Sequence, residues 1–103
     1  PAIISADGSQ QWFIDNMRHR VGGPAYILAN GSQYWRLNNT RERPDENGVH
    51  MPADVVYKNG KIVQQIWFRN DLIHRDNDAP AIKTDTKWSW YIEGKFIREL
   101  AIV

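Results

Sequence analysis

The sequence predicts an all-β protein, in which four tandem three-stranded hairpin repeats form an antiparallel meander sheet that is curled or closed. Three observations predict this: Pro-Ala occurs four times, a tryptophan follows each pair, and turn residues interrupt the chain at short intervals. Asn, Asp, Gly and Pro recur too often for a stretch of about ten residues to propagate a helix. Because a long open sheet edge invites aggregation, we expect the sheet to curl, to close or to pair with a second copy.

The repeat sets the domain organisation. The Pro-Ala pairs divide a single predicted domain, residues 1–103, into units of approximately 1–23, 24–51, 52–79 and 80–103. One tryptophan in each unit is followed eight residues later by an arginine; the pairs are Trp12 and Arg20, Trp35 and Arg43, Trp67 and Arg75, and Trp90 and Arg98. Chains of this length form one domain, since a second hydrophobic core needs far more residues.

Each unit contains the same predicted elements in the same order. A short β-branched or aromatic run follows Pro-Ala and ends at a turn; the turns are Asp7-Gly8, Asn30-Gly31, Asn59-Gly60 and Asp85-Thr86. A strand with the tryptophan comes next and ends at a second turn; these turns are Asp15-Asn16, Asn38-Asn39, Asn70-Asp71 and Glu93-Gly94. The Asp-Gly and Asn-Gly pairs of the first set are the strongest hairpin signals, because both residues tolerate positive φ. A third strand then ends at the arginine, and a polar loop closes the unit.

Counting from a two-residue second turn predicts which residues share a face. The first residue after each repeat tryptophan should pair with the sixth residue after that tryptophan, as in Phe13 with Arg18 and Phe68 with Ile73. The tryptophans should form the core face, because each ring buries a large apolar area. Arg20, Arg43, Arg75 and Arg98 should then lie on the opposite face, while most acidic residues lie in turns and loops.

The predicted opposite face mixes arginines with aromatic rings, and two interpretations remain open. The four arginines at the fixed offset fit a structural role, in which each bonds turn carbonyls while its stem covers a ring. Arginines and aromatics are also enriched at binding hot spots. The arginines that recur less regularly are the better binding candidates, and the predicted binding residues on these strands are Arg18, Arg36, Arg41, Arg69, Tyr34, Phe13 and Phe68.

One long loop interrupts the repeat and adds two candidates. This loop is residues 43–51 of the second unit, where the first unit has a connection of only three residues, and it includes His50 and Met51. Departures from a repeat often carry the specific task, and an exposed methionine suits a protein contact. The alternative is a tolerated surface insertion.

Signals for catalysis are weak. His19 and His74 occupy equivalent positions beside their tryptophans, which favours a structural role over that of a general base. The three histidines lack the spacing of a zinc site, and Gly22-Gly23 leads into a strand, which does not fit a phosphate-binding loop. We therefore expect a protein that is not an enzyme and that uses no metal or cofactor.

The motif Trp-x3-[Asn/Asp/Gly]-x3-Arg followed by Pro-Ala resembles short repeats of tailed-phage and giant-virus proteins. Tyr57 to Lys61 is also distantly similar to the variant MORN repeat. The third unit matches best, whereas the second has Glu42 and the fourth Ile97 in place of the motif's histidine. The resemblance implies a β-hairpin architecture and, at most, binding or scaffolding.

These observations favour a small protein-binding module, and the resemblance adds a phage protein that modulates or inhibits a host or defence protein. The alternatives are a nucleic-acid binder with stacking aromatics, and a structural homo-oligomer whose second face is buried in a homodimer. The chain has no cysteine, a net charge of +1, no apolar run long enough to cross a bilayer and no signal peptide at residues 1–5, so we expect a cytoplasmic protein, in the bacterial host if phage-encoded.

Overall fold

The computed structural model describes residues 2–102, and in this range the protein contains β-strands and no helix. Pro1, which opens the first Pro-Ala pair, and Val103, which ends the predicted domain, lie outside the described residues. Over residues 2–102 there is accordingly no helix that could span a membrane. The strands are β1 (Ala2–Ile4), β2 (Gln10–Ile14), β3 (Met17–Arg18), β4 (Tyr26–Ile27), β5 (Gln33–Tyr34), β6 (Arg36–Leu37), β7 (Thr40–Arg41), β8 (Asp54–Lys58), β9 (Lys61–Ile66), β10 (Phe68–Arg69), β11 (Leu72–Ile73), β12 (Ile82–Thr84), β13 (Lys87–Ile92) and β14 (Lys95–Ala101).

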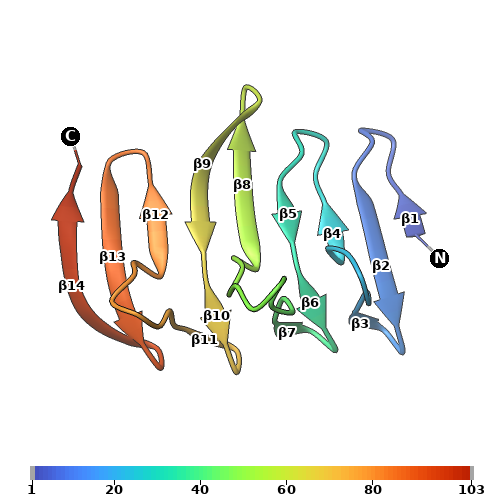
Figure 1. The fold of residues 1–103 in the computed structure, drawn as a ribbon. Helices are drawn as coiled ribbons and strands as arrows, with labels where there is room; N and C mark the ends of the chain where they lie inside the picture. The colour runs from blue at the N-terminus through green and yellow to red at the C-terminus, as the bar shows by residue number, and fades with distance from the viewer. Residues whose placement is uncertain (1, 103) are drawn as a thin grey trace.

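These strands form an antiparallel meander that follows the chain from one edge to the other (Figure 1). The main sheet has the order β1-β2-β4-β5-β8-β9-β12-β13-β14, and β3 pairs with β2 outside this path. The sheet is open, with β1 at one edge and β14 at the other, so closure, one of the two expected alternatives, is wrong. Closure would require these two edge strands to pair, and they lie at opposite ends of the sheet (Figure 1).

Three short strands lie below the main sheet and form small hairpins with the strands before them. β3 pairs with β2, β7 with β6 and β11 with β10, and each of the three is two residues long. The first strand after the connecting loop then takes the place beside the tryptophan strand, as when β4 pairs with the upper half of β2. At the end of the chain β14 is long enough to pair along the whole of β13.

The tight turns have the backbone conformation that their residues favour. Asn38 and Asn39 have φ values of 50° and 66°, and Asn59 and Gly60 have 52° and 77°. Positive φ at both central residues matches the right-handed twist of the flanking strands in two-residue hairpins. At Asn30-Gly31 only the glycine is positive, with φ of 94°, and the Leu28 amide donates to the Ser32 carbonyl in a three-residue loop.

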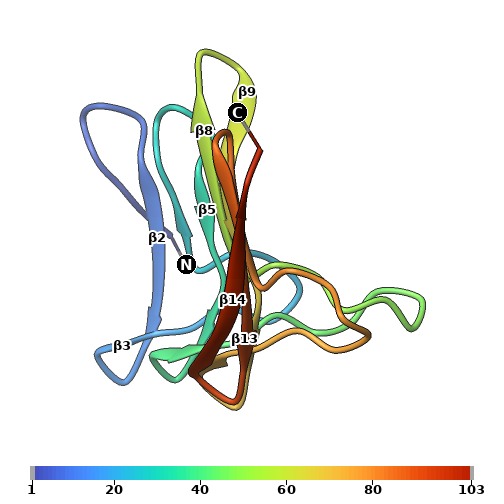
Figure 2. The ribbon, with the colours of Figure 1, turned by 90° about the vertical axis from the view of Figure 1, so that its left-hand side faces the viewer.

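The sheet is one layer thick, and its connecting loops project from one side (Figure 2). We call this side the tryptophan face, since Trp12, Trp35, Trp67 and Trp90 lie on it with the loops. Trp67 and Trp90 are buried, whereas Trp12 and Trp35 are half-buried. On the opposite side, which we call the arginine–aromatic face, Phe68 is only 4% exposed. Apolar burial is therefore divided between the two faces.

Candidate functional site

In each of the four repeat pairs, the arginine stacks on the tryptophan eight residues before it. The guanidinium carbon lies 3.8 Å from the ring centroid for Arg20 on Trp12, 4.2 Å for Arg43 on Trp35, and 3.8 Å for both Arg75 on Trp67 and Arg98 on Trp90. This is the geometry of a cation–π contact. The predicted placement of these four arginines on the face opposite the tryptophans is therefore wrong.

For Arg98 the cause is an irregularity that counting by twos cannot include. In the last hairpin the register shifts between Trp90 and Tyr91, so that Trp90 pairs with Arg98 while Tyr91 still pairs with Phe96. A bulge places two residues of one strand opposite one residue of the other and so moves the next side chain to the other face. The pairing of the residue after each tryptophan was predicted correctly, as Phe13 with Arg18 and Phe68 with Ile73 show.

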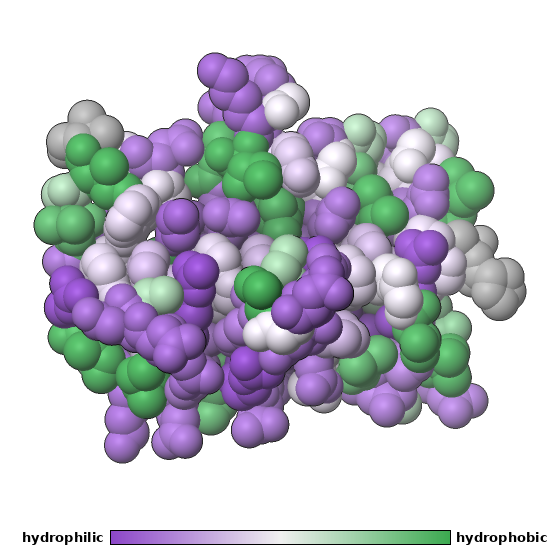
Figure 3. All heavy atoms as spheres, viewed as in Figure 1, coloured by the Kyte–Doolittle hydropathy of each residue, from purple (hydrophilic) through white to green (hydrophobic). Residues whose placement is uncertain are grey.

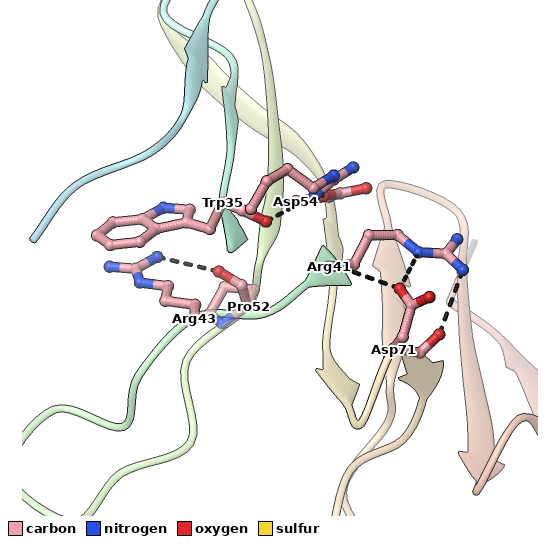
Figure 4. Close-up of polar contacts among 7 residues, drawn as sticks. Trp35, Arg41, Arg43, Pro52, Asp54 and Asp71 are labelled. Carbon is pink, nitrogen blue, oxygen red and sulfur yellow. Dashed lines mark hydrogen bonds and ion pairs between the residues drawn. The ribbon is translucent and has the colours of Figure 1, made fainter. Parts of the chain in front are cut away.

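Three of the stacked arginines also hold the loop that follows them. Arg20, Arg43 and Arg75 donate to the carbonyls of Pro24, Pro52 and Pro80, at 3.3, 3.0 and 3.0 Å respectively. Figure 4 shows Arg43 beneath the Trp35 ring with its bond to Pro52. The structural interpretation of these arginines is confirmed, because both the ring and the loop occupy the guanidinium.

Two histidines connect successive tight turns. His19 Nδ1 accepts the Asn38 amide at 3.0 Å, and His74 Nδ1 accepts the Glu93 amide at 2.9 Å. His74 Nε2 also contacts Asp76 Oδ1 at 2.7 Å, and this bond lowers the pKa of the Asp76 carboxyl. The equivalent role predicted for the two histidines is confirmed, and both rings are engaged in holding the fold.

The loops supply partners for two of the indole N–H groups. Trp67 Nε1 donates to the His50 carbonyl at 3.1 Å, and Trp90 Nε1 donates to the Asp78 carbonyl at 2.9 Å. Trp35 Nε1 is buried and has no hydrogen-bond partner within residues 2–102. The loop that precedes Trp35 in the chain, residues 21–23, is the shortest of the connecting loops, and it supplies no carbonyl to this N–H group.

Two of the predicted binding arginines on the opposite face are tied by acidic residues. Arg36 Nη1 lies 2.7 Å from Asp54 Oδ1, and the two side chains are only 15% and 12% exposed. Arg41 lies over the Phe68 ring at 4.8 Å, and its Nε donates to Asp71 Oδ1 at 2.9 Å. Figure 4 shows Arg41 and its contact with Asp71 on the side of the strands away from the Trp35 ring. Both guanidiniums are committed within the fold.

Arg18 differs from Arg36 and Arg41, since no carboxylate of residues 2–102 pairs with it. Its guanidinium carbon lies 4.5 Å from the Tyr26 ring centroid, and Nη2 donates to Gln11 Oε1 at 3.3 Å. The backbone of Arg18 is fixed, because its amide donates to Asn39 Oδ1 at 2.7 Å and its carbonyl accepts the Asn39 amide at 2.9 Å. Arg18 is therefore held in place, and guanidinium N–H groups remain available to a binding partner.

A shallow hollow of about 320 Å³ surrounds this arginine. We call it the Tyr–Arg hollow, and its lining residues are Arg18, Tyr26, Leu28, Tyr34 and Arg36. The Tyr26 and Tyr34 rings lie 5.8 Å apart with an angle of 34° between their planes. Burial, and then the nearby charge of Asp54, raise the pKa of the Tyr34 hydroxyl, which keeps it a hydrogen-bond donor at neutral pH.

The structure does not bring all the predicted site residues together. Tyr34, Arg18 and Arg36 meet at the hollow, whereas Phe13 is half-buried in the hairpin of β2 and β3. Phe68 lies beneath Arg41, and its burial removes the ring from the accessible surface.

Arg69, His50 and the 43–51 loop lie on the tryptophan face. Arg69 Nη1 donates to Asp45 Oδ1 at 3.1 Å, and His50 Nε2 lies 2.9 Å from the Phe68 carbonyl. Burial lowers the pKa of the His50 imidazole, whose Nδ1 is buried without a partner in the described chain. Met51 is half-buried. The 43–51 loop and the arginine–aromatic face thus cannot form one continuous surface.

A larger hollow of about 450 Å³ separates this loop from the loop at residues 76–79. Its charged groups already have partners: Asp45 binds Arg69, Asp76 binds His74, and Arg75 binds the Pro80 carbonyl. The smaller hollow is therefore the better candidate site, because Arg18 retains unused donors.

Sequence reasoning missed Tyr26 and Leu28 at this hollow. Both follow the second Pro-Ala pair, and the Asn30-Gly31 turn brings Tyr26 opposite Tyr34. Counting across that turn could have found this pair.

Comparison with models of protein families, with curated proteins and with solved structures finds no match for this chain.

Proposed function

We propose that the chain is a small, non-enzymatic protein-binding module that contacts its partner through the Tyr–Arg hollow. In this proposal residues 1–103 form one domain of four tandem units, with boundaries near residues 23, 51 and 79. The stacked arginines and the two histidines hold the units together, and the arginine–aromatic face is left for binding.

The single observation that carries the proposal is the environment of Arg18. Its guanidinium lies on the Tyr26 ring beside Tyr34, without a carboxylate partner in residues 2–102, while its backbone is fixed by Asn39. Arginine and tyrosine are, with tryptophan, the residue types most enriched at binding hot spots. A side chain held in place before binding also loses less conformational entropy when a partner docks.

The chemistry of the hollow indicates what a partner presents. Arg18 and the Tyr34 hydroxyl supply donors, whereas Arg36 is neutralised by the buried Asp54 carboxylate. An aspartate or glutamate of the partner would satisfy Arg18, and an apolar neighbour would cover Leu28 and the tyrosine rings. The family resemblance adds the proposal that this partner is a host or virion protein, met in the cytoplasm of an infected bacterium.

The proposal is tested by capture of partners on the immobilised protein. Bacterial lysate and purified virions are passed over the wild-type protein, an Arg18→Ala variant and a Lys61→Ala control. Lys61 is an exposed cation at the tip of the β8–β9 hairpin, and its removal leaves the hollow unchanged. Thermal melting verifies that all three proteins remain folded.

We expect a protein that binds the wild type and Lys61→Ala equally and binds Arg18→Ala at least ten-fold more weakly, as hot-spot truncations of about 1.4 kcal/mol or more do. Equal binding to Arg18→Ala, or no bound protein from either source, contradicts the proposal. A bound species that nuclease removes, with affinity that falls steeply between 50 and 200 mM salt, supports nucleic-acid binding instead.

A further inference from the structure

The outer edge of β14 is a long strand without a partner strand in residues 2–102. All seven residues of Lys95–Ala101 are exposed, although β13 pairs with them along the inner side. Phe96, Ile97 and Leu100 are 55%, 55% and 51% exposed. Figure 3 shows apolar side chains gathered at this edge of the molecule, where Figure 1 places β14.

The charges on β14 are engaged within the chain. Arg98 stacks on Trp90 and donates to Asp78 Oδ1 at 3.3 Å, and Glu99 Oε2 lies 3.2 Å from Lys87 Nζ. Proteins commonly protect an edge strand with free charges that repel an incoming strand. Of the charged residues of β14, only Lys95 lacks an oppositely charged partner within residues 2–102, and it lies beside the turn.

The strand directions decide which edge of a second copy fits. Nine strands lie along the path of the main sheet and every pairing is antiparallel, so β1 and β14 run in the same direction. Placing β1 of another copy beside β14, with the tryptophan faces of both copies on the same side, would give a parallel pair, unlike any pair in this sheet. Two β14 strands related by a two-fold axis would pair antiparallel and continue the meander.

The backbone of β14 presents the groups that such a pair needs. The Ile102 amide donates to the Thr86 carbonyl of the neighbouring connection at 2.9 Å. Because hydrogen-bonding direction alternates along an antiparallel strand, the amides and carbonyls of Glu99 and Ala101 point away from β13. These outward groups are the ones available to a second strand.

We infer that two copies of the chain associate through their β14 edges, with Leu100 on the two-fold axis. In this register Glu99 pairs with Ala101 of the partner subunit, and the reciprocal pair gives roughly four backbone hydrogen bonds. Moving the axis to Arg98 would place two guanidiniums opposite each other, and moving it to Glu99 would do the same with two carboxylates. Leu100 on the axis avoids both like-charge pairs and brings two apolar side chains together.

Disulfide cross-linking tests this register directly. The chain has no cysteine, so Leu100→Cys introduces a single thiol. Residues on the axis would form a non-hydrogen-bonded pair with Cα atoms about 4.5 Å apart, which is within the range that a disulfide spans. The control is Ile4→Cys on the opposite edge, where Ile4 is 68% exposed. We expect Leu100→Cys to give the covalent dimer at least ten-fold faster than Ile4→Cys; equal rates would overturn the inference.

A proline at the edge gives a second test. Ala101→Pro removes an outward amide that makes no bond to β13, and Ala101→Ser is a control that retains it. We expect sedimentation to show a concentration-dependent dimer for the wild type and Ala101→Ser, and a monomer for Ala101→Pro with the same thermal midpoint. A wild-type monomer at every concentration, or equal association by all three proteins, contradicts the inference. None of these results bears on the Tyr–Arg hollow, which lies on a face of the sheet and away from this edge.

Discussion

The guanidinium of Arg75 lies between two parts of the fold: 3.8 Å above the Trp67 ring and 3.0 Å from the Pro80 carbonyl, to which it donates. One side chain thus joins the strand that precedes it to the loop that follows it. Burial lowers the pKa of this guanidinium, which still remains charged at neutral pH. The contact explains why arginine recurs at this offset.

We expect Arg75→Lys to destabilise the protein by about 1–2 kcal/mol, because an ammonium loses the planar stack and the directed bond to Pro80. Arg98 stacks at the same distance but its side chain is half exposed. Arg98→Lys should therefore cost less than about 1 kcal/mol. Urea unfolding of both variants measures the difference, and an equal loss would contradict the role of burial.

Comparison of Trp67 with Trp35 separates the contribution of the indole ring to stability from that of its N–H hydrogen bond. Trp67→Phe removes the bond to the His50 carbonyl and should cost about 1–3 kcal/mol beyond the lost ring area, because the carbonyl is left without its donor. Trp35 Nε1 is buried without a partner in residues 2–102, so Trp35→Phe removes no bond. We expect the smaller loss at position 35 in thermal or urea unfolding. A larger loss there would show that the indole has a partner that the loop geometry does not reveal.

The Arg36–Asp54 pair is a structural contact, and a single substitution should reveal it. Arg36→Ala leaves a carboxylate that is only 12% exposed without its cation, which should cost about 3–5 kcal/mol. Replacing both residues, as Arg36→Met with Asp54→Leu, should recover most of this loss. Urea unfolding of the single and double variants measures both. A double variant as unstable as the single one would contradict this assignment.

The Arg41–Asp71 contact makes stability depend on pH. The bond from the Arg41 side chain lowers the pKa of Asp71 below its usual value of 3.8. A carboxyl with a lower pKa in the folded state contributes stability that is present above the unfolded-state pKa and is lost as the pH falls through the folded-state pKa. Asp71→Asn should thus destabilise the protein at pH 7, by less than about 1 kcal/mol at this exposed site, and have little effect near pH 2.

Asparagine is the matched replacement at position 71, because Asn39 occupies the equivalent turn position and accepts the Arg18 amide. Asp85→Asn provides the control, since it removes a carboxylate that makes no ion pair within residues 2–102. The measurement is the unfolding free energy of each protein across pH 2 to 7. A loss for Asp71→Asn that is the same at both ends of this range would contradict the electrostatic origin.

The sequence predicted the local parts of this fold better than the contacts between distant parts. The Asn38-Asn39 turn and the pairing of Phe13 with Arg18 follow from residue types and from counting across two residues. The position of Arg98 could not be counted, because a bulge beside Trp90 changes the face of every later side chain. The sheet was expected to curl, to close or to pair with a second copy, and the structure does not close it and leaves the outer edge of β14 open.

The residues of the candidate site could likewise be predicted where they depend on local strand alternation, but not where they depend on contacts between distant segments. Arg18, Tyr34 and Arg36 follow from the alternation of side chains along the strands. That Asp54 neutralises Arg36 while Arg18 is left without a carboxylate depends on the pairing of β5 with β8. The β6–β7 hairpin and the 43–51 loop lie between these strands, so their register cannot be counted across one tight turn. His50 lies on the other face because the 43–51 loop folds toward the tryptophans, whereas Arg69 lies there because side chains alternate and it stands two residues after Trp67.

A partner that docks at the Tyr–Arg hollow, as we propose, would leave the tryptophan face uncovered. A photo-crosslinking amino acid placed at Leu28, at the hollow, or at Val49, in the loop on the other side, tests it most directly. We expect a cross-linked partner from position 28 and none from position 49. Cross-linking from position 49 alone would contradict it.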